Sequence, residues 1–299
     1  MQNHELFNKI AVGFCGKALQ WIVNMQRWKS KLQVRGVIMK KVVKFGGSSL
    51  ANAEQFQKVG DIIRSDESRR YVVPSAPGKR FDEDIKVTDM LYGCYDAASK
   101  GEDITEKINA IKARYYEIIK GLGLSLSLEE EFKKIDEDFR AQAGIQYAAS
   151  RGEFLNGKIM AAYLGYDFVD AASVIRFDKA GNLEAEETNK LLSKKLSKSQ
   201  HAVIPGFYGA CADGTVKTFS RGGSDVTGSL VAKAIHADIY ENWTDVSGFL
   251  VTDPRIVHNP EPIEAITYRE LRELSYMGAT VLHEDAIFPV RKEGIPINI

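Results

Sequence analysis

Short apolar runs alternate along the chain with longer stretches in which apolar residues recur at helical spacing. The runs KVVKF, RYVVPSA, YDFVDA, HAVIPGF and DIYENW have the length and composition of buried strands. Between the first two, residues 51–65 place Phe56, Val59 and Ile63 on one helical face, and Asn52 with Gln55 resembles a capping box. Strands separated by helices in this way predict an α/β fold with a mostly parallel central sheet that helices cover on both faces.

Residues 103–141 form a highly charged helical stretch that includes the run EEEFKKIDEDFR. A solvated helical face explains such a run better than an acidic binding patch does, so we assign it no chemistry. The sequence contains no convincing internal repeat and no low-complexity linker. This favours one domain made of two lobes over two independent domains.

The first 38 residues differ from the rest of the chain. Their run IAVGFCGKALQWIV resembles the apolar core of a signal peptide, but Lys17 interrupts it and no small-residue cleavage site follows. An amphipathic surface helix is one alternative. Another is a translated leader, because codons for residues 35–39 can form a bacterial ribosome-binding site before an ATG. We favour the leader, with Met39 as the native start and residues 39–299 as the functional domain.

Composition limits the classes of function. The chain has 299 residues, 44% of them hydrophobic, and 40 basic residues balance 40 acidic ones, so the formal net charge is zero. No overall field favours nucleic acid or an anionic membrane, and no uncharged apolar run approaches the ~20 residues that span a bilayer. The three cysteines lie far apart, which fits a reducing compartment. We expect a cytoplasmic protein without nucleic-acid or membrane partners, in which any recognition of anions is local.

A glycine-rich turn follows the first predicted strand. In KFGGSS, Lys44 ends an apolar run and is followed closely by Gly46, Gly47 and Ser48. A turn of this kind before a helix exposes backbone N–H groups that favour a phosphate, and the lysine would add a full positive charge. The spacing matches neither the Walker pattern nor GxGxxG. Alone it is a weak signal, because a strand-ending lysine that points to solvent is at least as common.

Other turns add polar residues in similar positions. In TFSRGGSD, Arg221, Ser224 and Asp225 precede an apolar helical stretch, although Asp225 could be a plain helix cap and Arg221 a surface residue. In SRGE, Glu153 precedes a helix, where a carboxylate would pair with the helix dipole or bind an ammonium group. A further polar loop after a predicted strand contains Thr244, Asp245, Asp253 and Arg255. Because loops at the carboxyl ends of strands form the ligand crevice of an open α/β sheet, we expect one shared site.

Taken in order, these motifs resemble the aspartokinases of the amino acid kinase superfamily. The resemblance runs from about Met39 to the C-terminus and includes KFGGSS, SAPG, VTDML, SRGE, GFYG, TFSRGGSD, WTDVSGFLVTDPR and YMGATVLH. It implies a three-layer αβα sandwich of the amino-acid kinase (carbamate kinase-like) fold, with the amino acid in the N-terminal lobe and the nucleotide in the C-terminal lobe. It also implies that the chain uses ATP and Mg²⁺ to phosphorylate the β-carboxylate of L-aspartate, the first step of lysine, threonine and methionine synthesis.

The resemblance assigns catalysis to Lys44 and Asp225. Lys44, with the amides of Gly46, Gly47 and Ser48, would hold the transferring γ-phosphoryl group, and Asp225 would orient the cationic groups and organise the metal–phosphate assembly. No covalent intermediate and no cluster of metal-binding side chains is implied. The residues expected to face the nucleotide are Thr244, Asp245 and Arg255.

The same resemblance assigns the aspartate contacts. Arg221 would clamp the α-carboxylate with its bidentate guanidinium, and Glu153 would bind the α-ammonium. Thr88 and Ser224 would contribute hydroxyl groups near the substrate, and Ser75 would line the pocket at the end of its strand.

Three features depart from the family pattern. Leu250 stands where many members have a tyrosine, and Thr280 stands where many have a lysine, both on the nucleotide side. A charged insertion, KRFDEDIK, separates SAPG from VTDML and Thr88. Family members normally continue into paired ACT domains that bind feedback inhibitors, whereas this sequence ends at IPINI, which resembles a strand of the catalytic domain. We therefore expect a C-terminally truncated catalytic domain that lysine and threonine do not inhibit.

Two rival hypotheses stay open. A kinase for glutamate or N-acetylglutamate would share the fold, although the pair SRGE and SRGGSD favours aspartate. The other rival is a catalytically dead fragment kept as a folded or dimerising piece. A homo-oligomer is open as a partner in every case.

Overall fold

The computed structural model describes residues 39–220, 222–244, 248, 250, 257–276 and 284–299, without the side chains of 272, 274–276 and 284–286. The proposed leader, residues 1–38, lies outside the described residues. The chain divides into two compact units. The larger consists of Lys40–Gly248 and Ala279–Ile299, and the smaller contains Phe249–Gly278.

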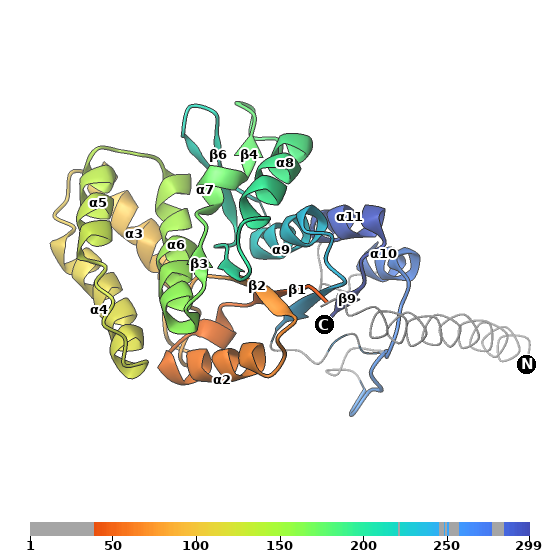
Figure 1. Cartoon of the computed structure of the whole chain (residues 1–299). Coiled ribbons are helices and arrows are strands. Elements are labelled where there is room, and N and C mark those ends of the chain that lie inside the picture. The colour runs from red at the N-terminus through yellow and green to blue at the C-terminus, as the bar shows by residue number, and fades with distance from the viewer. Residues whose placement is uncertain (1–38, 221, 245–247, 249, 251–256, 277–283) are drawn as a thin grey trace, which may run out of the picture. The chain divides into compact units, whose positions relative to one another are not determined.

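The larger unit is built around a parallel sheet of six strands in the order β3-β5-β2-β1-β8-β9 (Figure 1). Each of the five apolar runs supplies one strand, and the run IPINI supplies the sixth, so the predicted α/β class and mostly parallel sheet are confirmed. The strands are β1 (Lys41–Phe45), β2 (Arg69–Pro74), β3 (Asp167–Phe168), β5 (Ala202–Val203), β8 (Ile239–Trp243) and β9 (Ile297–Asn298).

Helices cover both faces of this sheet, which confirms the expected three layers. Val43 and Phe45 of β1 join a core with α2 (Ala53–Arg64) and α6 (Ile145–Leu164) on one face. Asn52 caps α2, because its side chain accepts a hydrogen bond of 3.0 Å from the N–H of Gln55. On the other face α9 (Gly223–Ala234) packs on β1, β2 and β8, and α11 (Glu284–Glu293) packs on α9 (Figure 1).

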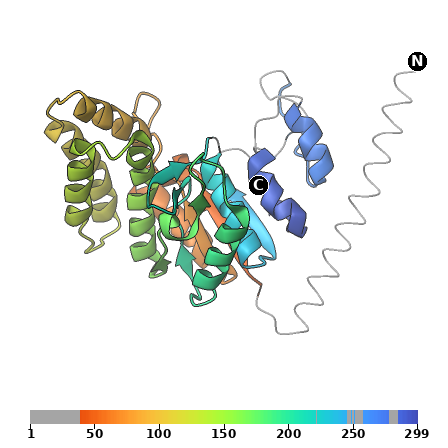
Figure 2. The same cartoon turned by 90° about the horizontal axis from the view of Figure 1, so that it is seen from above.

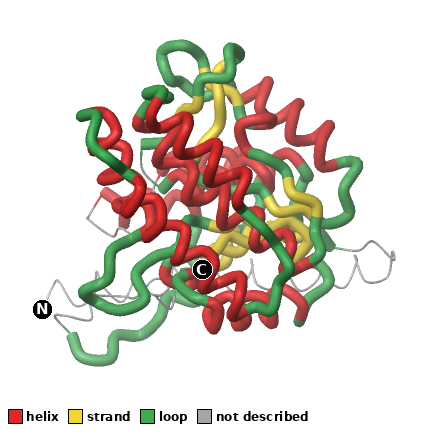
Figure 3. The backbone as a smooth tube through the Cα atoms, turned by 90° about the vertical axis from the view of Figure 1, so that its left-hand side faces the viewer, coloured by secondary structure: helices red, strands yellow, loops and turns green. Residues whose placement is uncertain are grey.

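A group of helices extends the core beyond α6 (Figure 3). It consists of α3 (Val87–Ser99), α4 (Thr105–Gly121) and α5 (Glu129–Arg140). The stretch 103–141 is therefore helical and highly charged as predicted, and it forms the two helices α4 and α5. The break follows from Gly123, whose φ of 67° continues the chain out of α4 in a left-handed conformation that glycine adopts easily. Each helix buries an apolar side and carries most of its charges on the opposite side, although Arg114 of α4 is buried.

A small second sheet has the strand order β4-β6-β7 and lies beside the large one (Figure 2). It contains β4 (Arg176–Phe177), β6 (Tyr208–Cys211) and β7 (Val216–Thr218), with α7 (Ala171–Val174) and α8 (Ala185–Leu196) nearby in sequence. The predicted strand-like run TVKTF is β7. The N–H of Thr218 donates to Oε1 of Gln146 at 3.0 Å, which ties this sheet to α6 just before the chain enters α9.

The smaller unit contains α10 (Tyr268–Tyr276) and an isolated bridge between Leu250 and Pro262. Thr267 and Glu270 form a capping box at the start of α10, because the Thr267 N–H donates to Oε2 of Glu270 at 2.8 Å and the Glu270 N–H donates to Oγ1 of Thr267 at 3.3 Å.

Membrane-spanning helices and cysteines were both considered from composition, and the described part of the chain shows the following. None of its helices combines the length and the apolar character that crossing a membrane requires. Cys94 and Cys211 are buried and free, as expected for cysteines that form no disulfide, and Cys15 lies outside the described residues.

Candidate active site

Lys44 and Asp225 form an ion pair at the carboxyl end of the central strand β1. The Lys44 side chain is 10% exposed, and its Nζ lies 2.7 Å from Oδ1 of Asp225, in the first turn of α9. Nδ2 of Asn242, on the neighbouring strand β8, donates to the same carboxylate oxygen at 3.2 Å. The lysine therefore does not point freely to solvent. Asp225 is not a plain helix cap either, because α9 is preceded by Gly222 and has no side-chain cap.

The hydroxyl group of Tyr240 fixes the first turn of α9 against the sheet. It donates to the carbonyl oxygen of Asp225 at 3.1 Å. Tyr240 and Asn242 lie two residues apart on β8, so they share the face of the sheet that α9 covers. The carboxylate and the backbone of Asp225 are thus both held by one strand.

The turn predicted to bind phosphate, residues 46–48 and called the phosphate turn below, lies in backbone contact with the turn after β2. The N–H of Gly78 donates to the carbonyl oxygen of Gly47 at 2.8 Å. A Cβ atom on Gly78 would lie 2.6 Å from the carbonyl carbon of Gly47, so this approach requires glycine. Nζ of Lys44 lies 3.9 Å from where a Cβ on Gly46 would be, which places the ammonium group beside the turn. The Gly46 N–H itself donates to the carbonyl oxygen of Trp243 at 3.2 Å.

Glu153 is a buried carboxyl group in the interior of α6 (Ile145–Leu164), so the expectation that it precedes a helix and pairs with the helix dipole is wrong. Its Oε2 has no hydrogen-bond partner among the described residues. Burial raises the pKa of Glu153 from its usual 4.5 to about 8, although the backbone N–H groups of Ala76 and of Glu153 itself act in the opposite direction. A buried polar atom without a partner, in a group with a strongly shifted pKa, is typical of a functional site.

Thr88 and the turn after β2 lie close to Glu153. A Cβ atom on the adjacent Gly152 would lie 2.8 Å from the Cβ of Ala76 and 3.8 Å from Oγ1 of Thr88. A Cβ on Gly47 would in turn lie 2.8 Å from the carbonyl oxygen of Ala76. Ala76 therefore stands between the phosphate turn and the Glu153 carboxyl group, which belong to one region at the carboxyl ends of the strands.

Ser75 and Ser224 also lie at this edge of the sheet. The carbonyl oxygen of Ser75, directly after β2, accepts a hydrogen bond of 2.6 Å from Nδ2 of the buried Asn156 on α6. Ser224 is buried at the start of α9, where a Cβ on Gly206 would lie 2.5 Å from its Oγ. The N–H of Gly206 donates to the carbonyl oxygen of Pro74 at 3.1 Å, so β2, β5 and α9 meet there.

The structure describes only some of the remaining residues that the sequence predicts near the site. Thr244 follows β8 directly, at the same edge of the sheet as Lys44. Leu250 belongs to the smaller unit. Outside the described residues lie Arg221, Asp245, Asp253, Arg255 and Thr280.

Two structural features near the site were not predicted from the sequence. Asn242 bonds Asp225, but in the run DIYENW it looked like an ordinary strand residue. Phe207 has a φ of 78°, a left-handed conformation that is rare for a bulky residue and often occurs at functional sites. The motif GFYG contains Phe207 and was the only available signal for it. No group of three or more metal-ligating side chains occurs in the described part of the chain.

Comparison with known proteins identifies the family of the chain. The chain matches the amino acid kinase family over residues 39–299. It is 40% identical to "Aspartokinase 3" of Bacillus subtilis in an alignment 275 residues long, which covers 87% of this chain and 60% of that protein. The crystal structure of Clostridium acetobutylicum aspartate kinase is 53% identical, with a TM-score of 0.83, over 87% of this chain and 59% of that one.

A third comparison involves a structure with ligands. Escherichia coli aspartokinase III, solved in complex with aspartate and ADP, is 28% identical with a TM-score of 0.74. The match covers 86% of this chain and 61% of that one. The chain thus spans about three fifths of the length of the relatives named here.

Proposed function

Because the chain belongs to the amino acid kinase family, we propose that it transfers the γ-phosphoryl group of ATP to the β-carboxylate of L-aspartate. The observation that carries this proposal is the arrangement of charge at the carboxyl edge of the sheet. A buried lysine stands beside a glycine turn, and a buried carboxyl group with an unpartnered oxygen lies on the other side of Ala76. The similarity to aspartokinases supports aspartate as the acceptor.

Lys44 would stabilise the transferring phosphoryl group. Its ammonium group is already removed from most of its water and lies beside the Gly46–Gly47 turn, so little reorganisation is needed when negative charge develops. Asp225 and Asn242 would hold Lys44 in place before the nucleotide binds. Phosphoryl transfer requires little beyond positioning and charge stabilisation, which this arrangement offers.

Glu153 would recognise the α-ammonium group of aspartate. Its unpartnered Oε2 offers an acceptor that only a donor entering the site could satisfy. The hydroxyl group of Thr88 lies near the adjacent Gly152, where it would contact the same amino acid. Arg221 is proposed for the α-carboxylate on the strength of the motif TFSRGGSD.

Mg²⁺ would enter the site with ATP. Magnesium in kinase sites is held by one or two carboxylates and by substrate phosphates, so a large cluster of protein ligands is not needed. Asp225 is the carboxylate beside Lys44, and its chemistry suits this role. The metal would neutralise charge on the phosphates, while the chain's own residues bind and orient the two substrates.

A hydroxamate assay tests the proposal directly. The purified chain is incubated with L-aspartate, MgATP and hydroxylamine, which traps an acyl phosphate as a coloured hydroxamate. We expect aspartyl hydroxamate from the chain and at least 100-fold less from Lys44→Ala, because loss of one such electrostatic contact costs that much. Glutamyl or N-acetylglutamyl hydroxamate would instead identify a kinase for another acid. No hydroxamate with any of the acids would show that the chain is catalytically dead.

A further inference from the structure

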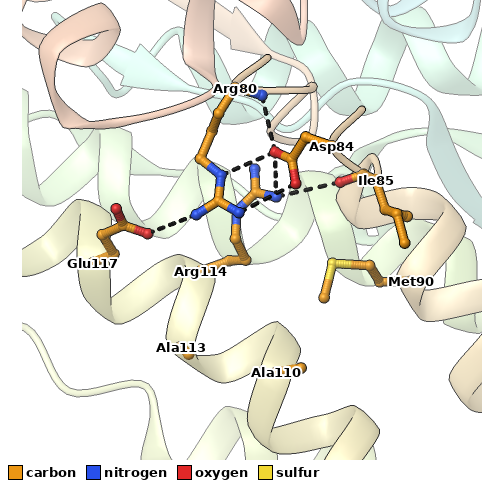
Figure 4. Close-up of a pocket in the computed structure, with 8 residues that line it drawn as sticks. All are labelled: Arg80, Asp84, Ile85, Met90, Ala110, Ala113, Arg114 and Glu117. Carbon is orange, nitrogen blue, oxygen red and sulfur yellow. Dashed lines mark hydrogen bonds and ion pairs between the residues drawn. The ribbon is translucent and has the colours of Figure 1, made fainter. Parts of the chain in front are cut away.

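A pocket of about 350 Å³ lies between α3, α4 and the segment that joins β2 to α3 (Figure 4). None of the proposed catalytic residues lines it. Its charged residues pair with one another, and they come from the charged insertion KRFDEDIK and from α4. They are Arg80, Asp84, Arg114 and Glu117. These side chains satisfy each other rather than present a charge to a ligand.

Arg114 holds both ends of the inserted segment. Its side chain, on α4, is 5% exposed. Nη2 donates to the carbonyl oxygen of Gly78 at 3.0 Å, and Nη1 donates to the carbonyl oxygen of Ile85 at 3.2 Å. Nη1 also pairs with Oδ2 of Asp84 at 2.9 Å (Figure 4). One planar guanidinium group therefore fixes the start and the end of the segment at once.

Arg80, Asp84 and Arg114 form a brace between the inserted segment and α4, in which Asp84 is the anion. Besides Arg114 it binds Arg80, whose Nε lies 2.9 Å from Oδ2 and whose Nη2 lies 3.1 Å from Oδ1. The hydrogen bonds from Arg80 hold the pKa of the Asp84 carboxyl group well below its usual range. Asp84 is thus charged at neutral pH. Arg114 also bonds the backbone of Gly78, whereas Arg80 does not.

Gly78 connects the brace to the phosphate turn. Its carbonyl oxygen accepts from Arg114, and its N–H donates to the carbonyl oxygen of Gly47 at 2.8 Å. The other end of the segment leads into α3, where the Val87 N–H donates to the carbonyl oxygen of Pro77 at 3.3 Å and Thr88 follows. The segment therefore ends on both sides next to residues of the proposed site.

We propose that Arg114, with Asp84 as its counter-ion, is a positioning residue for the phosphate turn. It acts through Gly78, whose backbone holds Gly47 beside the Lys44 ammonium group. The inference rests on the proposed phosphoryl transfer for its kinetic consequence, but the structural link can be measured without any activity. The charged insertion that interrupts the family motifs contributes Asp84, the counter-ion of this brace.

Hydrogen exchange tests whether Arg114 stabilises the phosphate turn through Gly78. Arg114→Met removes every donor of the guanidinium group at similar length. We expect it to accelerate exchange of the backbone amides in residues 46–51, which include the Leu50 N–H that donates to Gly47, by about tenfold, or about 1.4 kcal/mol. Arg80→Met breaks an ion pair to the same Asp84 but leaves the bond to Gly78, so it should accelerate exchange only within the insertion. Lys112 lies on α4 like Arg114, and Lys112→Met, which breaks a surface pair with Glu129 of α5, should change neither region.

Steady-state kinetics test whether Arg114 supports the proposed phosphoryl transfer. Arg114→Met should lower kcat about tenfold with a smaller change in KM for aspartate, since Arg114 bonds Gly78 beside the phosphate turn but bonds none of the proposed aspartate ligands directly. Arg114→Lys keeps the charge but cannot bond Gly78, Ile85 and Asp84 together, so it should show the same direction of change. If Arg114→Met does not fold, Arg114→Lys carries both tests.

Two results would overturn the inference. One is unchanged exchange of residues 46–51 in a folded Arg114 variant. The other is an equal effect of Arg80→Met on residues 46–51, which would assign the link to the ion pair alone. If the unmodified chain lacks kinase activity, the proposed function fails, while the exchange experiment still decides whether Arg114 positions the turn.

Discussion

Aspartate binding should strengthen as the pH rises from 7 to 8, because the proposed ligand of its ammonium group must lose a proton first. Burial raises the pKa of Glu153 to about 8. A neutral carboxyl group cannot form an ion pair with the ammonium group, so only the ionised fraction of the chain is competent to bind. Proton release and aspartate binding are then linked.

The size of the effect follows from that pKa. With a pKa of about 8, roughly a tenth of the Glu153 carboxyl groups are ionised at pH 7 and about half at pH 8. The apparent dissociation constant equals the intrinsic one divided by the competent fraction. It should therefore fall about fivefold over this range, and at pH 7 close to one proton should be released for each aspartate bound.

Isothermal titration calorimetry measures both quantities. L-aspartate is titrated at pH 7.0 and 8.0 in two buffers of different ionisation enthalpy, whose difference in heat reports the protons released. Glu153→Gln should bind weakly and without this pH dependence. Succinate, which lacks the ammonium group, serves as the control ligand and should show neither the fivefold change nor the proton release. A dissociation constant that is flat from pH 7 to 8 for the unmodified chain would refute the reasoning.

The same residue makes the stability of the unliganded chain depend on pH. The pKa of Glu153 is raised on folding from 4.5 to about 8, so the folded chain binds this proton more tightly than the unfolded chain. The stabilisation is complete below pH 4.5 and is lost as the pH rises toward 8, by at most about 1.4 kcal/mol per pH unit. Urea unfolding of Glu153→Gln beside the unmodified chain at pH 5, 6.5 and 8 isolates this slope, which the variant should lack.

Three further substitutions test the site and its supports. Lys44→Met should lower kcat by about 100-fold or more while the far-ultraviolet circular dichroism stays native, and near-normal turnover would exclude Lys44 from catalysis. Gly78→Ala should cost about 1–3 kcal/mol in urea unfolding, since its Cβ would lie 2.6 Å from backbone, whereas Gly93→Ala on α3, with no neighbour within 4 Å, should not destabilise; equal costs would contradict the close approach. Tyr115→Phe removes a hydroxyl group that donates to the Gly152 carbonyl oxygen at 2.8 Å and should cost about 0.5–1.5 kcal/mol by the same measurement. An unchanged midpoint of urea unfolding would show that this hydrogen bond does not contribute to stability.

The sequence predicted the elements of the fold because their signals are local. Apolar runs of five to seven residues identified the strands, and the apolar spacing in residues 51–65 identified α2. The small sheet was only partly foreseen, since the two-residue strand β4 is too short for a periodic signal. The stretch 103–141 was predicted to be helical without a division, because its charge pattern continues through both helices, and the break follows Gly123.

The site was harder to predict because its contacts are not local. Lys44 and Asp225 are distant in sequence, and they meet because β1 pairs with β8 and α9 crosses that face. The motif resemblance proposed both residues but not their ion pair or the bond from Asn242. The insertion KRFDEDIK shows the same limit, since the sequence identified it only as a charged insertion, whereas the structure pairs its Asp84 with Arg114 of α4.

The alternation of β1 explains why a lysine in an apolar strand fits a phosphoryl-transfer site. Val43 and Phe45 enter the core on one face, so the intervening Lys44 must face α9. An ammonium group in that position costs free energy unless it is paired, and Asp225 supplies the counter-charge at 2.7 Å. Because Lys44 has already lost most of its water, a phosphate that reaches it gains a strong interaction without the cost of stripping that water again. The core packing of β1 thus positions the charge, and the ion pair keeps it ready for the nucleotide.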